Sequence, residues 1–341
     1  MRNWLTLSLL LMPLALQNPS IPGERAAMDA HNAELRKMLQ NTAPLAMDAT
    51  PIPVKHPDGA GLVSWVAADR QGLTYLLRRT ADTDAVLVID RDGRVVRSWG
   101  KGLFTTAHAI RVDPRGNVWT VDAASSMVYK FSPEGKTLLQ IEIGGQPAPC
   151  GNFCSTTDIA FAPDGNLFIA DGYRNARILE YSPDGKKLRE WGQAGSGPGE
   201  FRLPHSIQVA PDGVVYVADR ENGRIQRFDR KGSYLGEWRY GKTFGLKLAG
   251  DAMWLTSIPR GPNGVPGWLL KVDIRSGTLL GWVDAIGMHG IDLTPSGEVL
   301  HASPVANEPP QRHSLVTKVL DEGSRRGFSP KVLDEGSKRR F

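Results

Sequence analysis

The sequence AIRVDPRGNVWTVDAA at residues 109–124 decides the fold, because copies of it recur along the chain. The clearest copies are DIAFAPDGNLFIADGY at 158–173, SIQVAPDGVVYVADRE at 206–221 and GIDLTPSGEVLHASPV at 290–305. Weaker copies are WVAADRQGLTYLLRRT at 65–80 and GLKLAGDAMWLTSIPR at 245–260. Each copy has two alternating apolar runs around a turn with glycine, a pattern that is typical of a β-hairpin.

The hairpins repeat with one period. Their turn glycines fall at 72, 116, 165, 213, 250 and 297, at intervals of 44, 49, 48, 37 and 47 residues. A second hairpin follows in each of the first five units, at 86–100, 128–142, 178–192, 225–239 and 269–283. Two hairpins in about 45 residues predict one four-stranded blade of a β-propeller.

The six copies predict an all-β chain that forms a six-bladed β-propeller over residues 61–319. An open β-solenoid or two sandwiches would also consist of short strands, but six copies with a single period argue against both. The sixth unit has no clear second hairpin. We expect residues 301–320 to supply one of its outer strands and a strand from before Gly61 to complete the ring.

The two ends of the chain lie outside the repeat. Residues 1–20, with one arginine followed by an apolar run, are typical of a secretory signal peptide, although a lipid-free N-terminal anchor is an alternative. We therefore expect a secreted or periplasmic protein. Residues 21–60 are expected to form an arm with a short helix in AAMDAHNAELRKMLQN at 26–41. Residues 320–341, part of a duplicated charged segment, predict a mobile tail.

The charge excludes one class of function. The formal net charge is +5, but residues 318–341 hold seven Lys or Arg against four Asp or Glu and so contribute +3 of it. The rest of the chain is near balance and has no basic stripe that would indicate nucleic acid. We expect a monomer that acts on a small molecule or a peptide, with no nucleic-acid partner and, after removal of the signal, no membrane partner.

Three histidines occur at one position of alternate repeats. His108, His205 and His289 each lie eight residues before a turn glycine, whereas Thr157 and Lys242 have this offset in the intervening repeats. In a closed ring these histidines would converge on the axis, where three neutral imidazoles could hold a metal ion and leave it an open coordination position. The alternative is three histidines that only form hydrogen bonds. Their common offset favours the metal.

Around these histidines the sequence resembles a known family. The strings ADGYRNARI at 170–178, LPHSI at 203–207 and VADRENGRIQRF at 217–228 are similar to the lyase core of peptidyl-α-hydroxyglycine α-amidating enzymes. The resemblance covers residues 60–300. It implies a six-bladed propeller of NHL-type repeats in which the three matched histidines hold a catalytic zinc.

The resemblance also implies roles for neighbouring residues. Tyr173 matches the base that deprotonates the substrate hydroxyl. Arg220 and an arginine of the first blade, best matched by Arg78 with Arg79 as a competitor, match residues that contact the substrate. From the residues alone, Tyr173 could instead close a turn, and Arg220 could pair with Asp219 or Glu221. Asp122, Asp171 and Asp219 recur after equivalent strands, so we interpret them as structural.

The chain departs from the family at three places. The resemblance implies a structural calcium held by the backbone carbonyls of Val66 and Ile110 and by an aspartate after the third histidine, but Gly290 stands there. Asp292 is a poor substitute. A pocket methionine falls on Gly287, which leaves Met288 shifted by one residue. The family disulfide would join the position of Cys154 to that of Arg174, so that Cys150 is the remaining candidate partner.

These observations predict a zinc-dependent carbon–nitrogen lyase that cleaves an α-hydroxyglycine-type substrate and releases glyoxylate. Two alternatives stay open. One is a non-catalytic NHL-type propeller that binds a peptide, glycan or protein. The other is a metal-assisted hydrolase such as a lactonase, against which the histidine ligands argue.

Overall fold

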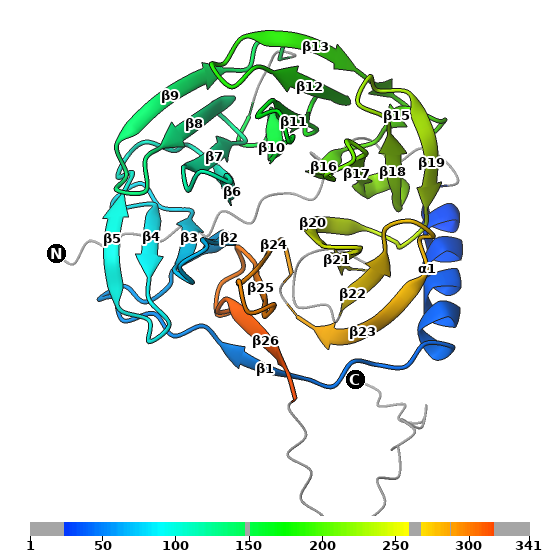
Figure 1. The fold of residues 1–341 in the computed structure, drawn as a ribbon, viewed down its shortest axis with the longest axis horizontal. Helices are drawn as coiled ribbons and strands as arrows, with labels where there is room; N and C mark the ends of the chain where they lie inside the picture. Colours follow the sequence, from blue (N-terminus) through cyan, green and yellow to red (C-terminus); the bar gives the residue numbers. More distant parts are fainter. Residues whose placement is uncertain (1–23, 147–150, 259–266, 287, 317–341) are drawn as a thin grey trace, which may run out of the picture.

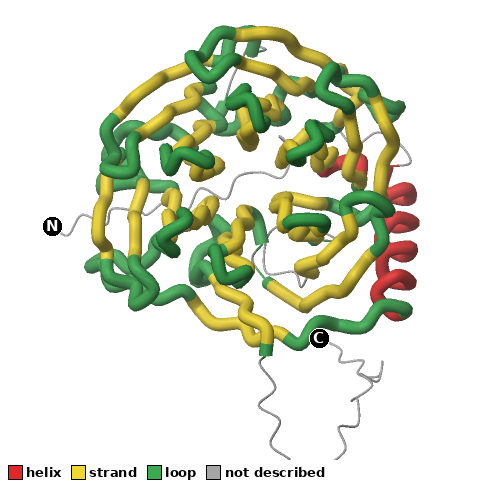
Figure 2. Tube along the Cα trace, in the orientation of Figure 1, coloured by secondary structure: helices red, strands yellow, loops and turns green. Residues whose placement is uncertain are grey.

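Six four-stranded antiparallel sheets form a closed ring in the computed structural model, which describes residues 24–146, 151–258, 267–286 and 288–316 (Figure 1). Each sheet is one blade, with its first strand next to the central axis and its last strand at the circumference. The tube view shows that strands dominate and that one long helix lies against the outside of the ring (Figure 2). The predicted six-bladed β-propeller with an N-terminal helix is confirmed.

The strands follow the predicted hairpins. Blades 1 and 2 consist of β2 (Val63–Ala68), β3 (Thr74–Arg78), β4 (Val86–Ile89), β5 (Val95–Trp99), β6 (Ala107–Val112), β7 (Val118–Asp122), β8 (Met127–Phe131) and β9 (Thr137–Glu142). Blades 3 and 4 consist of β10 (Thr156–Phe161), β11 (Leu167–Asp171), β12 (Arg177–Tyr181), β13 (Lys187–Trp191), β16 (Pro204–Val209), β17 (Val215–Asp219), β18 (Arg224–Phe228) and β19 (Tyr234–Trp238). A short parallel pair, β14 (Gln193–Ala194) and β15 (Glu200–Phe201), connects them.

Blades 5 and 6 complete the ring. Blade 5 consists of β20 (Thr243–Ala249), β21 (Ala252–Ser257), β22 (Gly267–Asp273) and β23 (Leu279–Ala285). Blade 6 consists of β24 (Gly290–Leu293), β25 (Val299–Ala302), β26 (Gln311–Leu315) and β1 (Met47–Pro51). Since β1 comes from before the first blade and pairs with β26, the two ends of the propeller are held together by backbone hydrogen bonds, as the sequence predicts.

The turn chemistry explains why the hairpins form where they do. In blade 2, Oδ1 of Asp113 accepts hydrogen bonds from the backbone N–H groups of Arg115 and Asn117, both at 2.9 Å. Gly116 then adopts a φ of +87°, which residues other than glycine rarely adopt. Aspartate at the start and glycine at the end therefore fix the register of the strands that follow.

Burial decreases from the axis to the circumference. All residues of β7, the second strand of blade 2, are buried, whereas four of the six residues of the outermost strand β9 are exposed. Large apolar side chains such as Trp119 and Phe168 are almost fully buried in the clusters that extend across neighbouring blades. Burial of each such side chain contributes about 1.5–3 kcal/mol, so packing between blades stabilises the ring.

Helix α1 (Glu24–Gln40) packs against the outer side of blade 5 (Figure 1). Its residues Leu35 and Leu39 are buried in one cluster with Tyr240 and Leu270. A short 3-10 helix, η2 (Arg220–Asn222), follows β17. None of the helices in the described residues is long and apolar enough to cross a membrane.

The predicted signal peptide at 1–20 and the tail at 320–341 lie outside the described residues, so both stay predictions. Cys154 is buried and belongs to a disulfide bond. The sequence has one other cysteine, Cys150, and this residue lies outside the described residues.

Candidate metal centre

A β-bulge opens the innermost strand of the first five blades. In β6, Ala107 pairs with Asp122 and Ala109 with Val121, so that His108 is the extra residue. The same shift makes extra residues of Ser64, Thr157, His205 and Phe244. A bulge turns a side chain out of the ladder, here towards the axis of the propeller. His289 precedes β24 and takes the corresponding place in blade 6.

In blade 5, the eight-residue offset from the turn glycine does not identify the residue that is equivalent to the histidines. Lys242 has the eight-residue offset in blade 5, but the structural equivalent of the histidines there is Phe244. The reason is a tighter hairpin. Ala249 pairs with Ala252 across a two-residue turn, whereas in blade 2 Val112 pairs with Val118. Counting back from the glycine therefore overshoots in blade 5.

The structure brings the three predicted histidines together. One ring nitrogen from each of His108, His205 and His289 lies within 4.8 Å of the others. All three side chains are buried, with at most 4% of their surface exposed. In the part of the chain that the structure describes, no other group of three or more His, Cys, Asp or Glu side chains is placed to hold a metal ion.

Each histidine is oriented by the backbone of the next blade. Nδ1 of His108 lies 2.5 Å from the Thr157 carbonyl oxygen, and Nδ1 of His205 lies 2.6 Å from that of Phe244. Nδ1 of His289 lies 2.9 Å from the carbonyl oxygen of Ser64. Because a carbonyl accepts, each Nδ1 carries the proton. The bulge residues of the three blades without a histidine therefore supply the carbonyl acceptors that orient the three histidines. Such hydrogen bonds are typical of metal-binding histidines.

This tautomer leaves the Nε2 atoms to bind a metal. Nε2 of His205 is buried and has no hydrogen-bond partner among the described residues. Burial, followed by the charge of Arg79, lowers the pKa of His289 to about 3, and burial also lowers the pKa of His108 and His205 well below the usual value. The histidines are therefore neutral near pH 7, in the form that coordinates metal. The residues fit a zinc ion with three nitrogen ligands.

Tyr173 contacts the histidine cluster through its hydroxyl group. It lies just after β11, and its hydroxyl is 2.8 Å from Nε2 of His108. Its ring packs against Phe153, with the centroids 4.7 Å apart. Burial raises the pKa of Tyr173, whereas the charges of Arg220 and Arg79 act to lower it. The hydroxyl therefore lies beside a histidine and within the field of two cations.

Arg220 lies in η2 beside the cluster. It is 6% exposed, its Nε donates to Oε1 of Glu221 at 2.8 Å, and its guanidinium lies 4.7 Å from the centroid of the Phe244 ring. Burial would raise the pKa of Glu221, but the charges of Arg220 and Lys242 lower it to about 2. Arg220 therefore forms the ion pair with Glu221 that the sequence offered as an alternative, and this pair holds Arg220 beside the histidines.

Arg79, rather than Arg78, faces the site. The Arg78 guanidinium binds Thr83 at 3.1 Å and the carbonyl of Asp84, on the way to the second hairpin of blade 1. Arg79 donates to the Ala107 carbonyl at 3.3 Å and lies 5.3 Å from the centroid of the Phe153 ring. Side chains alternate along β3, so adjacent arginines point in opposite directions. The position of Arg79 therefore favours it over Arg78 as the arginine that contacts the substrate, a role that stays a prediction.

The recurring aspartates have a structural role. Asp122 accepts from the backbone N–H groups of Thr105 and Thr106, at 2.7 and 2.9 Å. Asp219 accepts from the Arg202 backbone at 2.7 Å and from Arg224 at 2.8 Å. They tie the loop that enters each blade to the second strand.

The residues do not fit the calcium implied by the resemblance. Val66 and Ile110 lie on β2 and β6, two positions after the bulges, but the carboxylate is missing. A Cβ at Gly290 would lie 2.5 Å from the Trp65 indole, so no larger residue fits there. Asp292 instead accepts from the backbone of Leu293 at 2.7 Å and pairs with Lys247.

The shifted methionine packs into the apolar core between blades 5 and 6. Met288 is buried in a cluster with Trp254 and Leu269, and a Cβ on Gly267 would lie 2.9 Å from its Cε. Gly287 lies outside the described residues.

Sequence reasoning missed two aromatic residues of the site. Trp65 lies 5.4–6.5 Å from the three imidazole rings, measured between centroids, and forms the floor beneath them. Phe244 packs between His205 and Arg220. Phe244 could have been found by aligning the bulges rather than the turn glycines. The role of Trp65 had no signal in the repeat.

The fold and the site define an NHL-type β-propeller with a three-histidine centre on its axis. The NHL repeat family matches residues 201–228. A solved structure of streptogramin B lyase has the same fold, with a TM-score of 0.55 and 15% identity over 79% of this chain and 98% of that one.

Two curated relatives are more similar in sequence. Mouse peptidyl-glycine alpha-amidating monooxygenase is 42% identical over 157 residues, which are 43% of this chain and 16% of that protein. Drosophila melanogaster peptidyl-alpha-hydroxyglycine alpha-amidating lyase 2 is 30% identical over 240 residues, 65% of this chain and 58% of that protein. The chain thus spans less than two thirds of either relative. The predicted relation to the amidating lyase family is confirmed.

Proposed function

We propose that this chain is a zinc-dependent carbon–nitrogen lyase that converts an N-acyl-α-hydroxyglycine into an amide and glyoxylate. The observation that carries the proposal is the convergence of three neutral imidazoles with the hydroxyl of Tyr173 beside them. Relatives that are named as amidating lyases support the substrate class.

The zinc would be held by Nε2 of His108, His205 and His289. With three protein ligands it would keep an open position and polarise an oxygen of the substrate as a Lewis acid. The same nitrogens have no competing proton, because each Nδ1–H is already donated to a carbonyl.

Tyr173 would be the general base. The reaction removes a proton from the substrate hydroxyl, forms the aldehyde carbon–oxygen double bond, breaks the carbon–nitrogen bond and returns one proton to the nitrogen. A phenolate is a good base for this step only if its pKa falls towards the working pH. Arg79 and Arg220 act in that direction.

The two arginines would also bind the substrate carboxylate. They carry positive charge on two sides of Tyr173, from the end of β3 and from η2. A guanidinium binds a carboxylate in a planar, two-point contact. Phe153 and Phe244 stack against these guanidinium groups and restrict their orientation.

Release of glyoxylate from a model α-hydroxyglycine compound by the purified, zinc-loaded protein tests the proposal. We expect turnover that is lost in His205→Ala and kept in His56→Ala, which changes a histidine away from the centre. If the unchanged protein releases no more glyoxylate than His205→Ala, the lyase proposal is wrong.

We also propose that the protein is exported, as its first 20 residues predict, and that it acts as a monomer on a small molecule or peptide. Detection of the chain in the periplasm or medium, with cleavage near residue 20, would support export.

A further inference from the structure

Arg111 joins all six blades on the axis of the propeller, one layer below the histidines. It lies on β6, three residues after His108, and its side chain is 4% exposed. The innermost strands all run in the same direction, so residues at this depth form a layer next to the histidine layer. A guanidinium at this depth needs a complete set of acceptors, because an unpaired buried charge is strongly unfavourable.

The acceptors come from four other blades. Nε and Nη2 of Arg111 bind the two carboxylate oxygens of Asp158 in blade 3, at 2.9 and 2.6 Å. Nη1 donates to the Ile291 carbonyl of blade 6 at 3.0 Å. Nη2 also donates to the Leu246 carbonyl of blade 5 at 3.2 Å and lies 3.4 Å from Oγ of Ser206 in blade 4.

Blade 1 contributes Trp65, whose ring packs against the guanidinium of Arg111. The Arg111 guanidinium lies 4.9 Å from the centroid of the Trp65 ring, within the range of a cation–π contact. Trp65 therefore separates the guanidinium from the three imidazoles. A cation below the indole and a metal above it would be kept apart by an apolar layer.

Asp158, the counter-charge, is also satisfied. Its Oδ2 accepts from Oγ of Ser206 at 2.6 Å, and its Oδ1 accepts from the backbone of Ile159 at 2.9 Å. Oγ of Ser206 in turn accepts from the Leu246 backbone at 3.0 Å. The ion pair is thus bonded on all sides, the condition under which a buried pair is maintained.

The carbonyls that bind Arg111 are equivalent to those implied for calcium. Ile291 and Leu246 lie two positions after His289 and Phe244, just as Ile110 and Val66 lie two positions after His108 and Ser64. The same ring of carbonyls can therefore receive a metal ion or a guanidinium. Here no carboxylate follows the third histidine, because Trp65 fills the space beside Gly290.

We infer that the guanidinium of Arg111 is a built-in axial cation that replaces a structural calcium and ties the six blades together. The chain then needs no calcium to close its ring. This inference does not depend on the proposed lyase activity, since it concerns stability and calcium binding alone.

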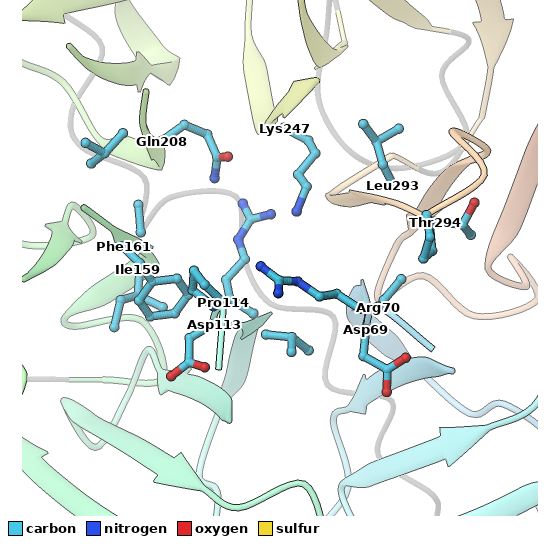
Figure 3. Close-up of a pocket in the computed structure, with 16 residues that line it drawn as sticks. Asp69, Arg70, Asp113, Pro114, Ile159, Phe161, Gln208, Lys247, Leu293 and Thr294 are labelled. Carbon is cyan, nitrogen blue, oxygen red and sulfur yellow. The ribbon is translucent and has the colours of Figure 1, made fainter. Parts of the chain in front are cut away.

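Arg111 also borders a cavity. This cavity has a volume of ≈ 320 Å³ and is lined by Arg111, Arg70, Gln208 and Lys247 among others (Figure 3). Arg70 and Lys247 point towards the middle of this cavity.

Calcium analysis of the unchanged protein is the first test. After dialysis against calcium and then against buffer, we expect no stoichiometric calcium by mass spectrometry, and the same Tm with added calcium chloride as with magnesium chloride. One calcium per chain, or a Tm that rises with calcium alone, would overturn the inference.

Substitution of Arg111 is the second test. Arg111→Met should lower the Tm by about 10 °C, because it leaves Asp158 buried without its partner. The matched control is Arg275→Met, which breaks a fully hydrated pair with Asp251 and should leave the Tm nearly unchanged. An equal Tm for Arg111→Met and the unchanged protein would contradict the inference. If Arg111→Met does not fold, the calcium measurement still decides.

Discussion

The hydroxyl of Tyr173 lies 2.8 Å from Nε2 of His108, the nitrogen that points towards the axis. Tyr173 follows a strand of blade 3, whereas His108 opens blade 2. This contact places an acid–base group within reach of the candidate metal ligands. It also means that a bound metal would compete with the tyrosine for the same nitrogen, so that the hydroxyl would be released towards a substrate.

The unchanged protein should contain about one zinc per chain, and each single change of His108, His205 or His289 to Ala should abolish it, because two remaining imidazoles make a weak site. Mass spectrometry of metal content after dialysis measures this. His56→Ala is the matched control and should keep its zinc. Zinc that survives loss of His205 would contradict the assignment.

Tyr173→Phe should keep zinc and lower kcat by about 10²- to 10⁴-fold, the usual effect of losing a general base. The phenyl ring keeps the packing against Phe153, so the Tm should stay nearly the same. Glyoxylate release and metal content, measured on one sample, separate catalysis from folding. Full activity in this variant would exclude Tyr173 as the base.

Arg79→Met should lower kcat/KM by about 10- to 150-fold, because a charged hydrogen bond to the substrate carboxylate is lost. Arg78→Met is the matched neighbour. It should lower the Tm, since Arg78 is buried and bound to Thr83 and Asp84, but leave kcat/KM unchanged. A lower kcat/KM in Arg78→Met, with kcat/KM unchanged in Arg79→Met, would show that Arg78 is the arginine that binds the substrate.

The metal-free protein should lose stability as the pH falls from about 6.5 towards 3. The folded pKa of all three histidines is depressed, to about 3 for His289, so the unfolded chain takes up their protons first. The free energy of unfolding contributed by the neutral histidines is therefore fully present above pH 6.5. It decreases by up to about 1.4 kcal/mol per pH unit for each histidine below that value.

Denaturant unfolding at several pH values measures this dependence. A variant with all three histidines changed to Gln is the control, because Gln does not titrate. Burial raises the pKa of Asp219 to about 6, which favours the folded state as the pH falls, but this contribution is common to both proteins. Equal slopes for the two proteins would show that the histidines do not titrate as described.

Gly290→Ala should destabilise the protein by about 1–3 kcal/mol, because its Cβ would lie 2.5 Å from the Trp65 indole. Gly144→Ala is the control, since no atom lies within 4 Å of the Cβ built there. Thermal unfolding and tryptophan fluorescence measure the two effects. An unchanged Tm in Gly290→Ala would show that Trp65 can move aside.

The repeat alone was enough to predict the architecture. The Asp to Gly turn of residues 113–116 fixes a local register, and six copies with one period leave a closed ring as the fold. The common offset of His108, His205 and His289 likewise predicted their convergence, because equivalent residues of a ring lie at equal distances from its axis.

The tertiary structure alone decided what surrounds these histidines. The choice of Arg79 over Arg78 depends on the direction of each side chain at the end of β3, and the place of Phe244 depends on a shortened hairpin. The contacts of Arg111 join residues separated by up to 180 positions in the chain. A repeat specifies contacts within a blade, whereas contacts across the axis form only when six blades close.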